Sequence, residues 1–214
     1  MNSPLSIIFI SPTTFSCVVS LINGRRLYLN KMKYIMNQTD EELVKAFQGG
    51  DDLAFVNLYN RYKRPVYLFC FRMLNDSENA KDVVQSVFSK IYERRRQLKE
   101  PAAFKSWLFS IARNDCLTVL RHARDRSELS EEVTESIIVE KEYDDSTTIV
   151  HRALLKLRPE DREVLILREY DRLSYMEIAG VLQATESAVK SRLFTARRHL
   201  FEILRPIMKE RRKQ

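Results

Sequence analysis

Apolar residues recur every three to four positions through most of the chain, a spacing that places them on one face of an α-helix. This periodicity predicts eight helices, over residues 39–48, 52–74, 77–97, 103–124, 149–157, 159–169, 174–182 and 185–204. No segment shows the apolar–polar alternation that is typical of a half-buried strand, and Gly and Pro are few, at four and six of 214 residues. The pattern therefore predicts an all-α fold.

Residues with strong local preferences mark the helix ends. Thr39 with Glu42, and Ser174 with Glu177, have the spacing of capping boxes, in which each side chain satisfies a free backbone N–H of the first turn. Pro65 lies inside the predicted helix 52–74, where its missing N–H predicts a kink or a break.

The helical segments fall into two blocks. Residues 127–148 combine Ser, Thr and acids with weak periodicity, which predicts a linker. The chain is thus expected to form two small helical domains, 37–126 and 149–210, joined by an acidic linker.

Residues 1–36 have a different composition from the rest of the chain. The moderately apolar run 5–22 is broken by Pro12, is marginal for a membrane helix, and lacks the preceding basic segment of a signal peptide. Three interpretations remain open: a true translation start at Met36, which we favour, a natural disordered extension, or a membrane anchor.

Charge is unevenly distributed along the chain. Residues 37–126 carry 16 Lys/Arg and 12 Asp/Glu, residues 149–214 carry 15 and 9, and residues 127–148 carry 1 and 8. Two basic blocks therefore flank an acidic strip, a distribution that favours a polyanionic partner but also fits an ordinary solvated surface.

Candidate catalytic and metal-binding chemistry is sparse. The three cysteines are scattered without metal-ligand spacing, which suits a reducing cytoplasm and argues against a disulfide framework or a zinc site. The three histidines are far apart, the densest acids lie in the linker, and no phosphate-binding glycine loop is present. We therefore expect no enzyme activity, catalytic residue, metal, cofactor or small-molecule substrate.

The last two predicted helices have the pattern of a helix-turn-helix. A short capped helix is followed by a turn at Gln183-Ala184 and by Thr185 as the next N-cap. The second helix has an apolar stripe and a separate outward stripe, so its N-terminal half is suited to the major groove. The candidate duplex-binding residues are Ser187, Lys190, Ser191, Arg192, Phe194, Arg197 and Arg198. The alternative is a helical hairpin with a solvated basic face, against which the outward aromatic Phe194 argues.

Two helices of the first block carry further candidate surfaces. Beside the Val-rich face of helix 77–97 runs a mixed polar stripe suited to docking a protein; the candidates are Asp82, Gln85, Phe88, Ser89 and Tyr92. Helix 103–124 combines aromatic, basic and amide side chains, which suit single-stranded DNA because bases offer faces for stacking and edges for hydrogen bonds. The candidates are Phe104, Lys105, Trp107, Asn114 and Arg121, with plain core packing as the alternative for Phe104 and Trp107.

Four segments resemble the extracytoplasmic-function subgroup of the sigma-70 family of RNA polymerase sigma factors. They are DVVQSVFSKIY (82–92), FKSWLFSIARNDCLTVLR (104–121), LRPEDREVLILREYDRLSYMEIA (157–179) and ESAVKSRLFTARRHL (186–200), in the family's order and at its usual separations. The resemblance covers about residues 39–204. It implies a region-2 domain at 37–126 and a region-4 helix-turn-helix domain at 149–210.

The resemblance also implies roles for individual residues. Asp82, Gln85 and Phe88 match the surface that binds the polymerase clamp. The loop 100–104, Trp107 and Asn114 match the part that melts the minus-10 element and captures an extruded base. Lys190, Ser191, Arg192 and Phe194 match the helix that recognises the minus-35 element.

Two positions depart from the family pattern. Arg172 stands where glycine is common, so extra strain or another geometry is expected in that turn. Thr195 stands where arginine is frequent, which puts one phosphate contact in doubt. The large domain that other family members have between regions 2 and 4 is absent, as in this subgroup.

The implied partners are core RNA polymerase, promoter DNA and an anti-sigma factor, which the family often tethers to the membrane. A one-component helix-turn-helix repressor or activator is the main alternative, although it would need no strand-separating surface.

Overall fold

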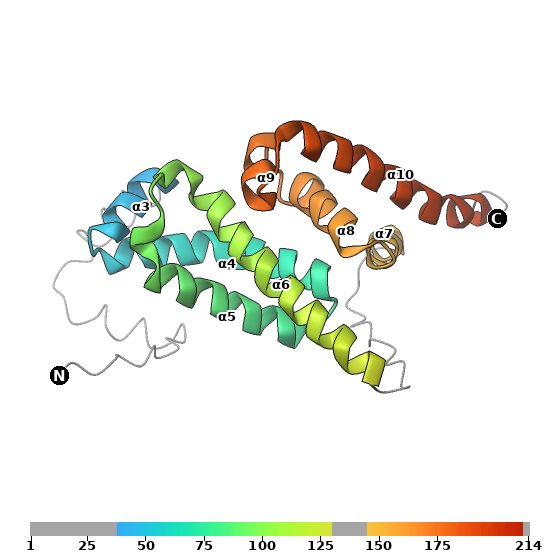
Figure 1. The fold of residues 1–214 in the computed structure, drawn as a ribbon, viewed down its shortest axis with the longest axis horizontal. Helices are drawn as coiled ribbons and strands as arrows, with labels where there is room; N and C mark the ends of the chain where they lie inside the picture. The colour runs from blue at the N-terminus through green and yellow to red at the C-terminus, as the bar shows by residue number, and fades with distance from the viewer. Residues whose placement is uncertain (1–37, 130–144, 212–214) are drawn as a thin grey trace. The chain divides into compact units, whose positions relative to one another are not determined.

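The computed structural model describes residues 38–129 and 145–211 (Figure 1). Every regular element in these two ranges is helical, so the prediction of an all-α fold is confirmed. The apolar run 5–22 and most of the acidic strip lie outside the described residues. Among the described helices, none is long and apolar enough to span a membrane.

The first helix group comprises α3 to α6 and covers the first half of the described chain. Its elements are α3 (Asp40–Gln48), α4 (Asp52–Leu74), α5 (Ser77–Glu93), the 3-10 turns η1 (Arg95–Gln97) and η2 (Pro101–Ala103), and α6 (Phe104–Leu129). Helix α4 has the predicted bounds and continues through Pro65, so the predicted alternative of a break does not occur. Helix α5 ends earlier than predicted, because the chain tightens into η1.

Local capping explains where these helices begin. Thr39 and Glu42 form the predicted capping box, with both reciprocal hydrogen bonds present. Asn75 ends α4 in the left-handed conformation (φ 54°), which Asn tolerates better than most residues, and Asp76 caps α5 by accepting from two backbone N–H groups.

The core of the first helix group is aromatic and aliphatic. Phe69 and Phe109 meet edge to face at 5.6 Å between ring centroids, and Tyr62 contacts Phe104 in the same way. Cys70 and Cys116 are both fully buried, and the hydrogen bond with Cys70, together with burial, raises the pKa of Cys116, as expected for an inert thiol.

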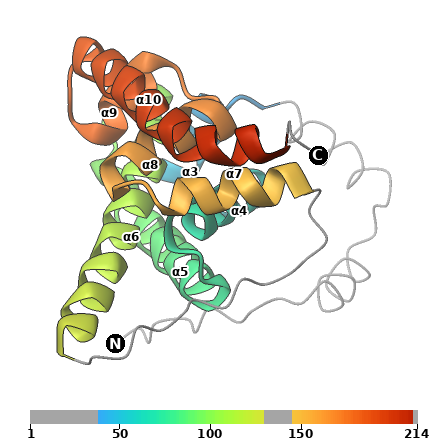
Figure 2. The same ribbon diagram turned by 90° about the vertical axis from the view of Figure 1, so that its right-hand side faces the viewer.

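The second helix group comprises α7 to α10. Its elements are α7 (Asp145–Leu155), α8 (Pro159–Leu165), the π-helical turn η3 (Ile166–Tyr170), α9 (Tyr175–Leu182) and α10 (Glu186–Arg211). Helices α6 and α7 both extend into the predicted linker 127–148, and residues 130–144 of that linker lie outside the described residues. Figure 2 shows α7 and α10 side by side.

The helix-turn-helix forms as predicted. Ser174 and Glu177 make the second capping box at the start of α9. Gln183 ends α9 in the left-handed conformation, and the Thr185 hydroxyl accepts from the backbone N–H of Ala188 to open α10. Val189, part of the predicted apolar stripe of α10, is buried.

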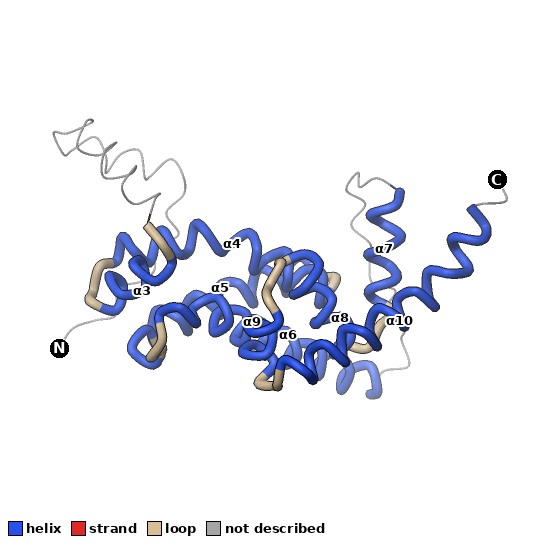
Figure 3. The backbone as a smooth tube through the Cα atoms, turned by 90° about the horizontal axis from the view of Figure 1, so that it is seen from above, coloured by secondary structure: helices blue, strands red, loops and turns tan. Residues whose placement is uncertain are grey.

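The two helix groups contact one another within the compact unit 39–214. Helix α6 packs against α9 (Figure 3). Helix α4 packs against α7, α8 and η3. Helices that lie far apart in the sequence thus form a single interface.

Candidate nucleic-acid interface

The outward stripe of α10 is open to solvent. Phe194 is 70% exposed, and Ser187, Ser191 and Arg198 are exposed along the same face. An exposed aromatic ring among hydroxyl and guanidinium groups offers apolar contact to a thymine methyl and hydrogen bonds to base edges or phosphates. The helix-turn-helix therefore presents the predicted duplex-binding stripe without rearrangement.

Three of the predicted cations of α10 have partners within the chain. Lys190 Nζ lies 5.4 Å from the centroid of the Tyr175 ring. The Arg197 guanidinium donates to the Glu169 carboxylate at 2.6 Å. Arg192, which is half-buried, lies 3.5 Å from Glu163. Lys190 and Arg197 are exposed and can exchange their contacts for DNA, whereas the partner of Arg192 is the fully buried carboxylate of Glu163.

On α6, the predicted residues differ in exposure. Phe104 is 1% exposed and packs on Tyr62 and Trp107, so its ring belongs to the core and cannot stack on a base in this conformation. Trp107 is half-buried, so its ring packs against the core and also has a part exposed to solvent that a DNA base could contact. Asn114 and Arg121 are exposed.

Lys105 is engaged by the second helix group. Its Nζ lies 3.4 Å from Glu177 of α9. Burial alone would raise the pKa of Glu177, but hydrogen bonds from Ser174 and the charge of Lys105 lower it overall, so this carboxylate is ionised near neutral pH. The adjacent Ser106 hydroxyl donates to the Glu177 backbone carbonyl at 3.1 Å.

Arg113 links α6 to Glu163 of α8 in the second helix group. Its Nε and Nη2 donate to the two oxygens of Glu163 at 2.7 and 3.1 Å, a bidentate geometry. Glu163 is fully buried; desolvation raises its pKa, and Arg113 and Arg192 partly offset that shift. Arg113 Nη1 also donates to the Asn114 side-chain oxygen at 3.3 Å.

Only part of the predicted docking stripe of α5 is exposed to solvent. Asp82 and Gln85 are exposed. Ser89 donates to Glu93 of its own helix, and the Tyr92 hydroxyl donates to Asp52 at 3.0 Å. Phe88 is 4% exposed with its ring 4.8 Å from that of Tyr59, so it supports this surface from the core and is not a contact residue in this conformation.

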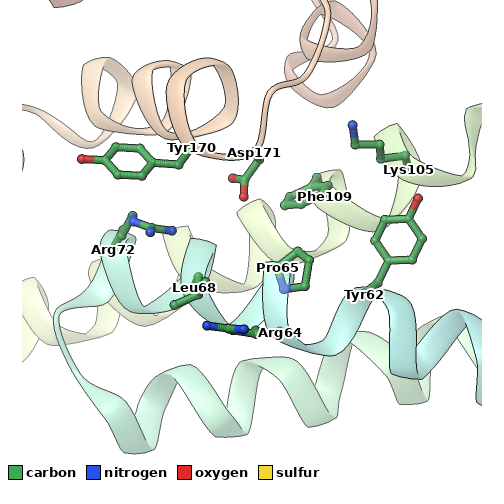
Figure 4. A pocket seen from close by; sticks show the side chains of 9 residues that line it. All are labelled: Tyr62, Arg64, Pro65, Leu68, Arg72, Lys105, Phe109, Tyr170 and Asp171. Atoms are coloured by element: carbon green, nitrogen blue, oxygen red, sulfur yellow. The ribbon is translucent and has the colours of Figure 1, made fainter.

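A cavity of about 270 Å³ lies between the helix groups. Figure 4 shows Asp171 entering it from the second helix group, opposite Arg72 and Pro65 of α4 and near Lys105 of α6. One Asp171 oxygen is buried without a hydrogen-bond partner. Burial raises the pKa of Asp171 to about 7, despite the opposing charges of Arg72 and Lys105.

The sequence pattern did not identify Arg113, Glu163, Ser106 and Glu177 as a connected group. Glu177 was expected only as a capping residue, and the other three lie in the family-like segments 104–121 and 157–179 without a role assigned to them. The packing of α6 against α9 and the Arg113–Glu163 side-chain contact with α8 bring them together.

The two departures from the family pattern have different consequences. Arg172 adopts φ 53°, so the turn keeps a left-handed geometry although a bulky side chain occupies it. Thr195 is half-buried on α10. Within the described ranges, no group of three His, Cys, Asp or Glu side chains is arranged to hold a metal ion.

Comparisons with known proteins support the two-part organisation. Residues 58–126 match the family model of sigma-70 region 2, and residues 147–200 match that of sigma-70 region 4. The first match lies on α4 to α6 and the second on α7 to α10. A one-component regulator would need no region-2 domain, so that alternative is not supported.

Curated relatives match over nearly their whole length. The RNA polymerase sigma-H factor of Pseudomonas aeruginosa is 30% identical over 194 residues, covering 82% of this chain and 99% of that protein. The ECF RNA polymerase sigma-E factor of Escherichia coli is 31% identical over 190 residues, covering 80% and 97%.

Solved structures show the same fold. CnrH, in complex with the cytosolic domain of CnrY, is 25% identical with a TM-score of 0.62, covering 78% of this chain and 97% of that one. The sigma factor RpoE of Bartonella quintana, in complex with the anti-sigma factor NepR, is 23% identical with a TM-score of 0.63, covering 71% and 96%. With both family models matched in order, the chain belongs to the sigma-70 family as an extracytoplasmic-function sigma factor, which directs RNA polymerase to promoters.

Proposed function

We propose that α5 docks core RNA polymerase through Asp82 and Gln85, that α6 melts the minus-10 element with Asn114 and Trp107, and that α10 binds the minus-35 duplex. The observation that carries the proposal is the solvent-open stripe of α10, where Phe194 stands among serine and arginine side chains on the second helix of a helix-turn-helix. No catalytic step is assigned to the chain. Because its partners are polymerase and DNA, the proposed location is the cytoplasm.

The two DNA-binding helices should act at different steps. Duplex binding by Lys190 neutralises phosphate and releases counterions, whereas Asn114 acts only after the strands part. Lys190→Ala should weaken closed-complex formation and reduce its salt slope by about one charge. Asn114→Ala should leave closed complexes nearly intact and impair melting by about 1–3 kcal/mol.

The test combines duplex binding at several salt concentrations with permanganate footprinting of the melted region, using polymerase holoenzyme. Lys209→Ala, an exposed lysine further along α10, and Asn60→Ala, an exposed asparagine on α4, are the matched controls. If Lys190→Ala and Asn114→Ala impair the same step with the same salt slope, the proposed division between duplex binding by α10 and strand melting by α6 is wrong.

The docking role of α5 rests on two exposed polar side chains beside a buried apolar face. Asp82→Ala combined with Gln85→Ala should weaken binding to core polymerase while helical content and thermal unfolding stay nearly unchanged, because neither side chain supports the core. The control pair is Glu78→Ala with Lys81→Ala, exposed on the same helix. Wild-type affinity in the Asp82/Gln85 variant contradicts the docking assignment.

An inhibitory protein partner of the anti-sigma type is also proposed. Its support is the fold shared with RpoE, which was solved in complex with the anti-sigma factor NepR, and with CnrH, which was solved with the cytosolic domain of CnrY.

A further inference from the structure

An open polar groove of about 510 Å³ lies between α8 and α10, beside the helix-turn-helix. Its lining combines charged and hydroxyl side chains: Arg158, Glu160 and Asp161 from the N-terminal end of α8, and Ser191, Arg192 and Thr195 from α10. Ser191 also belongs to the outward stripe of α10, so the groove is continuous with the surface that we propose binds duplex DNA.

Several charged side chains of this groove are already engaged within the protein. The Asp161 carboxylate accepts a hydrogen bond from His199 Nδ1 at 2.8 Å, and Arg192 lies 3.5 Å from the buried Glu163. Arg158 differs, because its side chain is 71% exposed and reaches Asp161 only at 3.4 Å. An ion pair this long and exposed contributes little to stability, so the Arg158 guanidinium can exchange it for another anion at small cost.

A helix in the major groove has a phosphate backbone on each side, because the groove is only about 12 Å wide. On α10, Lys190 lies toward Tyr175 of α9, with its Nζ 5.4 Å from the ring centroid. Ser191 and Thr195, one helical turn apart, line the groove toward α8 instead. On that side Arg158 supplies an exposed guanidinium and the two hydroxyls supply further donors, which together suit the oxygens of a phosphate.

We propose that this groove holds one phosphate of the DNA backbone, bound by the Arg158 guanidinium together with the hydroxyls of Ser191 and Thr195. The inference rests on the proposed binding of duplex DNA by α10, and it adds a contact from the beginning of α8. Because a phosphate carries no base identity, Arg158 contributes affinity and register but no preference among promoter sequences. Glu160 is exposed and lines the same groove, so its charge opposes the phosphate.

Single substitutions test the contact in polymerase holoenzyme. The probe is a fluorescein-labelled promoter duplex, recovered from random-sequence DNA by selection with the wild-type holoenzyme, and closed complexes are measured at several salt concentrations. Arg158→Ala should weaken binding about tenfold and reduce the salt slope by about one charge. Glu160→Gln should strengthen binding about two- to threefold. Arg152→Ala, which removes an exposed arginine of α7, should change neither the affinity nor the slope.

A methylphosphonate scan identifies the phosphate itself. Each charged phosphate of the duplex is replaced in turn by an uncharged methylphosphonate. At one position beside the minus-35 element, the wild type should lose affinity and the Arg158→Ala protein should lose little more. Thr195→Arg in the Arg158→Ala background should restore affinity, because it returns a guanidinium to the groove. Met208→Arg, which adds a cation at an exposed position further along α10, should not restore it.

Lys190→Ala, measured in parallel, separates failure of this inference from failure of the proposed function. If Lys190→Ala weakens closed complexes and Arg158→Ala leaves them unchanged, the groove holds no phosphate, although α10 still binds the duplex. If neither variant weakens them, the proposed duplex role of α10 has failed, and the inference fails with it. An Arg158→Ala protein that loses affinity but keeps wild-type sensitivity at every methylphosphonate also overturns the contact, because Arg158 then acts without touching a phosphate.

Discussion

The two helix groups differ in the polarity of their buried side chains and in the residue types that occupy positive-φ positions. In the first, the buried side chains are apolar, and the positive-φ positions are Gly50 and Asn75, which tolerate that conformation. In the second, Asp161, Arg162 and Glu163 are buried in consecutive positions of α8. Its positive-φ positions are Arg172 and Gln183, whose side chains make that conformation costly.

This difference indicates that the second helix group contains locally unfavourable residues because their side chains connect its helices to other parts of the chain. Glu163 connects α8 to Arg113 of α6, and the Asp161 carboxylate accepts a hydrogen bond from the ring Nδ1 of His199 of α10 at 2.8 Å. These buried charged residues of the second group thus contact both helices that we propose bind DNA, whereas the buried apolar residues of the two groups belong to one shared cluster. Perturbing the buried charged residues should therefore affect both stability and interdomain contact.

The largest effect is expected at Arg162. Its guanidinium donates to the backbone carbonyls of Leu154, Leu155 and Leu157 at the end of α7, and to that of Met73 at the end of α4. Arg162→Ala leaves these carbonyls without a donor, so we expect a loss of about 3–5 kcal/mol in the free energy of unfolding. Urea titration followed by circular dichroism measures it.

The control is Arg158→Ala. The Arg158 side chain is 71% exposed and contacts Asp161 at 3.4 Å, so its removal should cost at most about 1 kcal/mol. Similar losses in the free energy of unfolding for the two variants would mean that the buried Arg162 contributes no more to stability than the exposed Arg158.

Much of the fold follows from the sequence because its determinants are local. The helix starts were predicted correctly where the capping residue lies beside the helix that it caps. These residues are Thr39 for α3, Asp76 for α5 and Ser174 for α9. The apolar stripes also identified most of the core.

The site was harder to predict, because burial and pairing depend on distant segments. Phe88 and Phe104 carry the same periodic signal whether they face a partner or the core, and the structure buries both. The Arg113–Glu163 pair joins residues 50 positions apart, without any repeat or spacing that could indicate it.

A second effect, of intermediate size, concerns Asp171, whose pKa rises from 3.8 to about 7 on burial against α4 and α6. Arg64, Arg72 and Lys105 line the same cavity, and the charges of Arg72 and Lys105 oppose this rise in pKa. The folded chain binds more protons than the unfolded chain between these pH values, so the Asp171 contribution to stability falls as pH rises from about 4 to 7.

Asp171→Asn removes this titration. The variant should be more stable than the wild type at pH 8, by up to about 4 kcal/mol, and the difference should vanish as pH falls toward 4. Thermal unfolding of both proteins across this range is the measurement. A difference that is constant with pH would show that Asp171 is not desolvated by the first helix group.

The smallest effect is expected at Arg172, whose left-handed backbone (φ 53°) crowds its Cβ against the following carbonyl. Arg172→Gly removes that Cβ and should stabilise the chain by about 0.5–1 kcal/mol, since relief of strain exceeds the added flexibility of the unfolded glycine. Arg172→Ala is the matched control, because it removes the exposed side chain but keeps the Cβ. Urea midpoints should rise for the glycine variant alone. If both variants are equally stabilised, the guanidinium group of Arg172 destabilises the chain and its left-handed backbone does not. The proposed difference in backbone strain between the two helix groups is then wrong.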